Sequence, residues 1–196
     1  MDDFILYVSE GFYHVMNFNV GAYDHVLFFI LIAVPFLFNS WKKLIGLSLA
    51  FTIGHIISML LVIYGSVMFN SSYIEFLIVV TIAIAALYNI FTAGNRHRDN
   101  NNWVTLIVAL FFGLVHGFGF ANGFKMLASG AESKLLMLIE FALGIELGQL
   151  LVIFIVLVFN FMFTGLFRFN KNEWIQIISS IVLGMVIPLL IVRWMF

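Results

Sequence analysis

The chain has 196 residues, of which 63% are hydrophobic and 10% charged, with a formal net charge of −1 and a mean hydropathy of +1.11. A soluble domain of this size is closer to half apolar, so the composition predicts an integral membrane protein with a single domain over 1–196. The absence of cysteine excludes disulfides, thiolate metal sites and cysteine nucleophiles. No basic stripe interleaved with aromatic residues occurs, so nucleic acid is not an expected partner.

Residues 1–20 carry apolar side chains at helix-like spacing, including Phe4, Val8, Phe12 and Val15. We interpret this segment as a short interfacial helix, with an unusually polar additional span as the alternative. It begins with acidic residues and lacks a basic region and a small-residue cleavage site. It is therefore expected to stay on the mature protein rather than act as a secretory signal.

Six further segments are long and apolar enough to cross a bilayer, which requires about 20 residues each. Short polar stretches such as "FNSWKK", "TAGNRHRDNNN" and "RFNKNE" separate them. The predicted fold class is therefore an all-α integral membrane protein, a bundle of about six transmembrane helices. The predicted spans are 21–38, 44–69, 73–91, 104–127, 135–163 and 174–196.

The distribution of lysine and arginine predicts the orientation of this bundle. Six of the nine basic residues lie on one side, in the first, third and fifth loops, and three lie on the other. Loops rich in lysine and arginine stay in the cytoplasm, so both termini are predicted to lie outside it. The six are Lys42, Lys43, Arg96, Arg98, Arg168 and Lys171; the three are Lys125, Lys134 and Arg193.

Five ionisable residues fall inside predicted spans: Asp24, His25, His55, His116 and Glu146. Ionisable groups at membrane depth are costly and usually serve a function. They lie on four segments, so they can meet only if the helices bundle. A divalent metal ion is the simplest occupant of such a meeting point, and without cysteine its ligands must be imidazole or oxygen.

Other interpretations remain open for several of these residues. Asp24 could cap a helix, and His25 could lie at the headgroup level. Glu146 must be either protonated or paired with a cation, because an isolated buried carboxylate is strongly disfavoured. Ser and Thr side chains in spans also bond across helix seams. The expected second-shell or pathway residues are His14, Thr52, Ser58, Asn89 and Gln149.

Five strings carry a resemblance to a known family: "GAYDHVLFFI", "LAFTIGHIISM", "ALYNI", "FGLVHGFGFA" and "LGIELGQL". Together they resemble the HupE/UreJ family of bacterial membrane proteins, and more closely its second branch. The resemblance covers about residues 20–160. It implies a nickel or cobalt permease of the bacterial inner membrane, of the kind associated with hydrogenase and urease maturation. It also points to Asp24, His25, His55, His116 and Glu146 as the site.

The chain departs from the family pattern at one position. The family's first motif usually has a histidine followed by five residues and then the Asp-His pair; at the position of that histidine this chain has Phe18. His14, about one helical turn earlier, is a candidate replacement. The departure bears more on the choice of nickel than on the presence of a metal.

We therefore expect a membrane permease for a divalent transition-metal ion, with nickel, cobalt, zinc and iron as the candidates. One alternative is an intramembrane zinc hydrolase, in which three histidines leave a fourth position for water. Another is a non-catalytic accessory subunit whose polar residues hold a larger assembly together. The expected partners are the lipid bilayer and the metal ion, with a homo-oligomer or an accessory membrane protein as further candidates.

Overall fold

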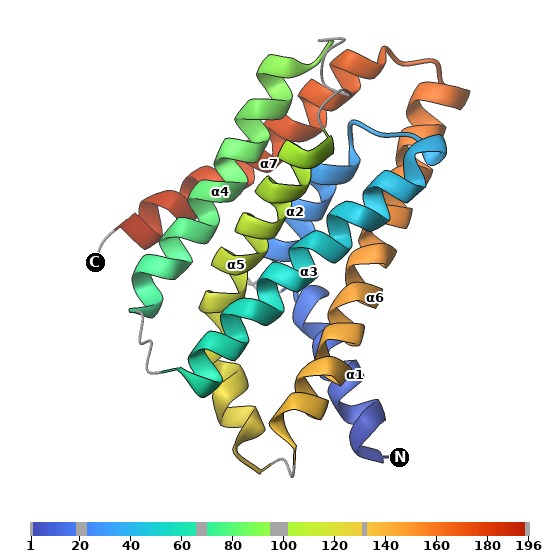
Figure 1. Cartoon of the computed structure of the whole chain (residues 1–196). Helices are drawn as coiled ribbons and strands as arrows, with labels where there is room; N and C mark the ends of the chain where they lie inside the picture. The colour runs from blue at the N-terminus through green and yellow to red at the C-terminus, as the bar shows by residue number, and fades with distance from the viewer. Residues whose placement is uncertain (1, 19–22, 66–69, 95–101, 131–132, 195–196) are drawn as a thin grey trace.

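A computed structural model describes residues 2–18, 23–65, 70–94, 102–130 and 133–194. These residues form seven α-helices and no strand (Figure 1). Two short 3-10 turns, Phe38–Ser40 and Ala128–Gly130, and a π-helical segment, Phe161–Leu166, flank the longer helices. The α-helices are α1 Asp2–Val15, α2 Asp24–Ala33, α3 Trp41–Tyr64, α4 Ser71–Thr92, α5 Asn102–Leu127, α6 Lys134–Asn160 and α7 Lys171–Trp194.

Five of the helices, α3 to α7, are long and apolar enough to cross a membrane. Large apolar side chains also cover the outside of the bundle: Phe91, Trp103 and Ile107 are 77%, 76% and 64% exposed. Such a surface suits lipid rather than water. The prediction of an all-helical membrane bundle is confirmed, and the chain is a multi-pass membrane protein.

The first predicted span, 21–38, differs from the structure, in which α2 has only 10 residues. A helix of that length rises about 15 Å, half the hydrocarbon thickness. Pro35 explains the early end, because proline has no backbone N–H to donate to the carbonyl oxygen of Leu31, which accepts from Asn89 instead. α2 accordingly ends at Ala33, with Val34 as its C-cap.

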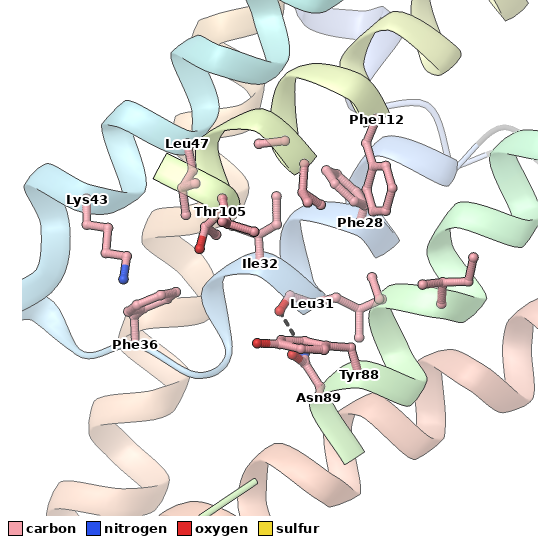
Figure 2. A pocket seen from close by; sticks show the side chains of 15 residues that line it. Phe28, Leu31, Ile32, Phe36, Lys43, Leu47, Tyr88, Asn89, Thr105 and Phe112 are labelled. Carbon is pink, nitrogen blue, oxygen red and sulfur yellow. Dashed lines mark hydrogen bonds between the residues drawn. The ribbon is translucent and has the colours of Figure 1, made fainter. Parts of the chain in front are cut away.

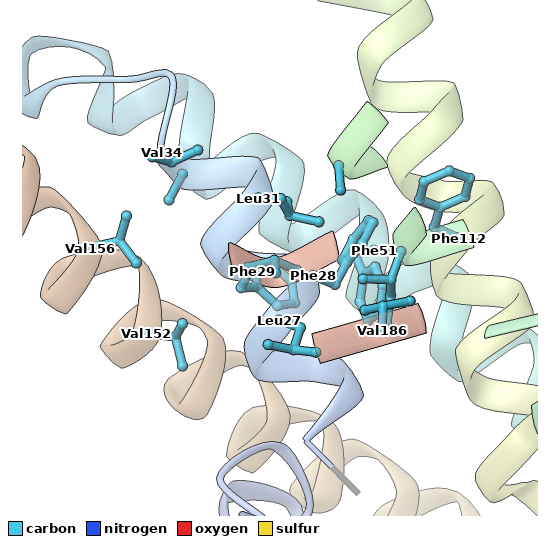
Figure 3. Close-up of a cluster of buried hydrophobic side chains, with 14 of the residues drawn as sticks. Leu27, Phe28, Phe29, Leu31, Val34, Phe51, Phe112, Val152, Val156 and Val186 are labelled. Carbon is cyan, nitrogen blue, oxygen red and sulfur yellow. The ribbon is translucent and has the colours of Figure 1, made fainter. Parts of the chain in front are cut away.

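The segment expected to lie at the interface instead packs along α6. A Cβ on Gly11 would overlap the carbonyl oxygen of Phe141, and one on Gly144 would overlap that of Val8. α2 then continues along the next part of α6, near Val152 and Val156 (Figures 1 and 3). α1 has 14 residues and α2 has 10, which together equal the 24 residues of α3. They lie end to end along α6, with α1 ending at Val15 and α2 beginning at Asp24.

A second close helix pair, α3 with α5, lies on the opposite side of α2. A Cβ on Gly54 would overlap the carbonyl oxygen of Leu110, and one on Gly113 would overlap that of Phe51. Small residues at such points let helix backbones approach in the absence of a hydrophobic driving force within the membrane. The α1–α6 and α3–α5 pairs therefore form two tightly packed walls.

α2 lies between these walls, in the centre of the bundle (Figure 3). Seven of its ten residues are buried. Leu27 and Phe29 belong to a cluster that also includes Val152 of α6 and Phe112 of α5. A helix that is apolar on all sides is a core helix, and this one positions the start of the site described next.

Two asparagines allow α2 to end inside the protein. The last carbonyl groups of a helix have no partner within it and must be satisfied elsewhere. Asn89 Nδ2 donates to the Leu31 carbonyl oxygen at 2.8 Å. Asn160 Nδ2 lies 3.1 Å from the Val34 carbonyl oxygen and 2.8 Å from that of Phe36. Polar side chains of α4 and α6 thus replace the water that a helix end normally meets.

Candidate metal centre

Three histidines meet near the end of α1 and the start of α2. His14 lies in the last turn of α1, His25 in the first turn of α2, and His55 in the middle of α3. One ring nitrogen of each lies within 4.8 Å of the others. Nitrogens bound to one ion at about 2.1 Å lie roughly 3.4 Å apart in a tetrahedral site. Each ring therefore needs to move toward the other two by only about 1 Å for all three to bind one ion.

The ring nitrogens of this histidine cluster (His14, His25 and His55) have few partners. His25 is 5% and His55 0% exposed, and His14 is half-buried. The Nε2 atoms of all three, and Nδ1 of His55, are buried without a hydrogen-bond partner in the described part of the chain. Unsatisfied buried polar atoms cost free energy, so their concentration at one point indicates a ligand.

His116 lies beside the cluster with a fixed tautomer. Its Nδ1 is 2.8 Å from the carbonyl oxygen of Phe112, one turn earlier on α5. A carbonyl oxygen only accepts, so Nδ1 carries the hydrogen and Nε2 holds the lone pair. That Nε2 is buried and without a partner, and the His116 ring centroid is 5.2 Å from that of His25. Its lone pair is thus available to an ion shared with the cluster.

Aromatic rings enclose these four imidazoles. The Phe120 ring lies 4.0 Å from that of His14, and the Phe51 ring lies 5.0 Å from that of His116. Phe28 packs on His116 with its centroid at 5.4 Å. This apolar shell lowers the local dielectric, which strengthens interactions between an ion and its ligands.

Asp24, expected at the same point, is held by a different partner. Its Oδ2 atom is 3.2 Å from Nη1 of Arg193, near the end of α7. The same Nη1 lies 3.2 Å from the backbone oxygen of Glu75 on α4. Asp24 also lies in the first turn of α2, where a negative charge offsets the partial positive charge of the helix end. Its carboxylate is therefore balanced by Arg193 and by the start of α2.

Glu146 lies in a separate polar cluster with Thr52, Gln149 and Ser48, between α3 and α6. Thr52 Oγ1 is 2.7 Å from Glu146 Oε2 and 3.1 Å from Gln149 Oε1. Ser48 Oγ is 2.7 Å from the same amide oxygen. Neither Glu146 nor Asp24 belongs to the group of ligand atoms within 4.8 Å formed by the histidine cluster.

The two remaining predicted residues take structural positions. Ser58 Oγ donates to the His55 carbonyl oxygen, at the contact with Gly117 of α5. Asn89 bonds the end of α2, as described above, and faces a different cavity.

That cavity, of about 420 Å³, lies between α2, α3, α4 and α5 (Figure 2). Most of its lining is apolar, and Phe28 and Phe112 separate it from His116. Among the described residues that line it, Lys43 is the one that is charged. A positively charged side chain and an apolar wall disfavour the passage of a cation, so the cavity is not a suitable route to the histidines.

A family model described as HupE / UreJ protein matches residues 1–195. The chain belongs to the HupE/UreJ family. No curated protein and no solved structure matches the chain. The resemblance drawn from five motifs is therefore confirmed over almost the whole chain.

The structure also accounts for the departure from the HupE/UreJ motif at Phe18. This side chain is 66% exposed and lies after the end of α1, whereas His14 points into the histidine cluster. Phe18 thus sits outside the cluster, and the imidazole on this segment comes from one turn earlier.

Sequence reasoning missed three residues that shape the site. Ser48 precedes Thr52 by four residues and His55 by seven, a helical spacing that could have identified it. Arg193 and Asn160 gave no such signal, because their partners Asp24 and Val34 are 169 and 126 residues away.

Proposed function

We propose that this protein is a membrane permease for a divalent transition-metal ion, with nickel and cobalt as the leading substrates. The ion is bound in transit by His14, His25 and His55, and His116 supplies a further nitrogen. One observation carries the proposal: three imidazoles from three helices present unpartnered nitrogens within 4.8 Å of one another. Membership of the HupE/UreJ family, which is generally associated with nickel and cobalt transport, supports the choice of metal.

The chemistry of the donors supports a borderline metal ion. Imidazole suits nickel, cobalt, zinc and iron, whereas magnesium and calcium prefer oxygen. The histidine cluster itself contributes no carboxylate. Its ligands are therefore neutral, which favours an ion that is released again over one that is held permanently.

The position of the cluster supports transport. Transporters commonly bind their substrate where a membrane helix is interrupted, because a break can be rearranged without disturbing a full helix. His14 and His25 lie on either side of the break between α1 and α2. A small displacement of the end of α1 would separate His14 from the other two rings and weaken the site.

The test is metal binding by the purified protein in detergent, measured by isothermal titration with nickel, cobalt and zinc. Loss of a residue that hydrogen-bonds to a metal ligand weakens metal binding roughly 10- to 100-fold. Replacing a ligand itself, His14, His25 or His55, by alanine should weaken binding by more than that. His97→Ala is the matched control, since His97 lies between two arginines in the sequence and outside the predicted spans. Equal binding by all variants would refute the site.

Uptake into proteoliposomes then separates a permease from an enzyme. Nickel or cobalt should accumulate inside vesicles with the wild-type protein and not with His55→Ala. Tight zinc binding without uptake of any metal would instead favour the intramembrane hydrolase.

We also propose that the protein lies in the bacterial inner membrane with both termini outside the cytoplasm. The bias of lysine and arginine toward the first, third and fifth loops supports this orientation.

A further inference from the structure

The polar cluster of Ser48, Thr52, Glu146 and Gln149 brings four side-chain oxygens together within the bundle. Ser48 and Thr52 lie one turn apart on α3, and Glu146 and Gln149 one turn apart on α6. The three oxygen–oxygen distances that join them are 2.7, 2.7 and 3.1 Å. Ser48 and Gln149 are 0% exposed and Thr52 is 5% exposed.

The hydrogens of these contacts depend on the orientation of the Gln149 amide. With Oε1 facing the hydroxyl groups, Ser48 supplies the hydrogen of its contact with Gln149, and Thr52 has one hydrogen for two acceptors, at 2.7 and 3.1 Å. A half-turn of the amide removes this shortage, because Nε2 then donates to both hydroxyl groups and Thr52 donates to Glu146. Neither orientation neutralises the carboxylate of Glu146.

The charge of Glu146 is the deficit that remains in either orientation of the amide. Its Oε1 atom is buried without a partner, and among the described residues no lysine or arginine forms an ion pair with its carboxylate. The buried Nε2 of Gln149 also lacks an acceptor. A carboxylate at this depth requires a compensating positive charge.

We infer that Ser48, Thr52, Glu146 and Gln149 form a second cation site that holds one exchangeable monovalent cation, either a proton or Na⁺. A proton on Glu146 Oε2 completes the chain, because Glu146 then donates to Thr52, and Thr52 donates to Gln149. A sodium ion among the same oxygens satisfies the same deficit, and a water bound to it can accept from Gln149 Nε2. In both cases one positive charge balances one carboxylate.

This site is chemically distinct from the histidine cluster. It contains oxygens, which suit hard cations, whereas the cluster contains imidazole nitrogens. Thr52 and His55 are three residues apart on one face of α3, a rise of about 4.5 Å. The two sites are therefore close enough for the charge at one to influence the other.

Other titratable groups near Glu146 do not supply the missing charge. The helices packed against α6 carry Glu10 and His14 on α1, Asp24 and His25 on α2, and His55 on α3. None of them is hydrogen-bonded or ion-paired to Glu146 in the described part of the chain. The lysines of α3, at 42 and 43, lie more than two helical turns from Thr52.

A monovalent cation bound next to a metal site can couple the movement of one ion to that of the other. This coupling role rests on the proposed function, whereas occupation of the site by a cation does not. The experiment therefore measures occupation directly.

The sodium arm of the test uses thermal unfolding of the purified, metal-free protein in detergent. Replacing choline chloride by NaCl at constant ionic strength should raise the unfolding temperature. The shift should be lost in Glu146→Gln and Thr52→Val and retained in Thr52→Ser, which keeps the hydroxyl. His14→Ala is the matched control and should keep the shift.

The proton arm uses infrared spectroscopy in choline chloride between pH 5 and 9. A protonated Glu146 should give a carbonyl stretching band that disappears in Glu146→Gln and moves in Thr52→Val. A response in either arm identifies the cation. No response in both arms, or a response unchanged in Glu146→Gln, would overturn the inference. Nickel binding separates the two proposals, because it should survive in Thr52→Val and fail in His55→Ala.

Discussion

The guanidinium group of Arg193 lies 3.2 Å from the carboxylate of Asp24, which joins the last turn of α7 to the first turn of α2. The two side chains are 15% and 12% exposed, so the pair is largely shielded from solvent. Since Asp24 is the neighbour of His25, this ion pair fixes the start of the helix that carries one of the candidate ligands.

Asp24→Asn should therefore lower stability by up to about 3 kcal/mol, because the guanidinium then loses the nearer of two carboxylates and keeps that of Glu75, whose Oε2 lies 4.0 Å from its Nε. Arg193→Gln should have a similar effect. The double variant should be less destabilised than the sum of the two single variants, as expected for residues in direct contact. Unfolding in detergent measures all three, and additive effects would show that the pair contributes nothing.

Asn160→Leu should destabilise the protein by about 1–3 kcal/mol, because it leaves the carbonyl oxygens at the end of α2 without a donor. It also removes the acceptor of Trp174 Nε1, which lies 2.8 Å from Asn160 Oδ1. Asn122→Leu is the control, since Asn122 is exposed on α5. Equal unfolding temperatures for the two variants would contradict the proposed role of Asn160.

Gly113→Ala should push α3 and α5 apart, because the added methyl group would overlap the Phe51 carbonyl oxygen. Overpacking of this kind costs about 1–3 kcal/mol. Gly184→Ala is the matched control, since an added Cβ there meets nothing within 4 Å. It should be neutral, or stabilising by up to about 1 kcal/mol through helix propensity. A Gly113→Ala protein as stable as Gly184→Ala would show that the helix pair tolerates separation.

His116→Ala should weaken metal binding less than His55→Ala. The Nε2 of His116 is oriented by its bond to Phe112, but it lies outside the group of nitrogens within 4.8 Å. Isothermal titration with nickel gives both affinities. The reverse order would place the ion nearer to α5 than to the break between α1 and α2.

The orientation can be tested with single cysteines, because the natural chain has none. Lys134→Cys should react with a membrane-impermeant maleimide added to intact spheroplasts, and Lys42→Cys only after permeabilisation. Both positions are exposed. Labelling in the opposite order would invert the topology predicted from the basic residues.

Hydropathy was sufficient to predict the long helices, because each span requires a continuous apolar segment. It failed at α2, where apolar residues continue past the end of the helix through Val34, Phe36 and Leu37. Pro35 was the signal for that end. The composition of a segment thus predicts that it is buried, but not that it remains helical.

The candidate site was predicted less completely. Its four histidines were all identified, yet His14 was placed among the second-shell or pathway residues, since a sequence does not show that α1 packs on α6. The sequence also did not predict that Asp24 and Glu146 lie apart from the histidines. It depends on Arg193 and Thr52, which lie on other helices.

The pairing of α1 with α6 has a consequence for biosynthesis. Gly11 packs against Phe141, which is synthesised 130 residues later. A helix of 14 residues is too short to hold a transmembrane position alone, and α1 must wait at the translocon or the membrane surface until α6 emerges. The three imidazoles therefore come together only near the end of translation, and a truncated chain that lacks α6 would not capture metal.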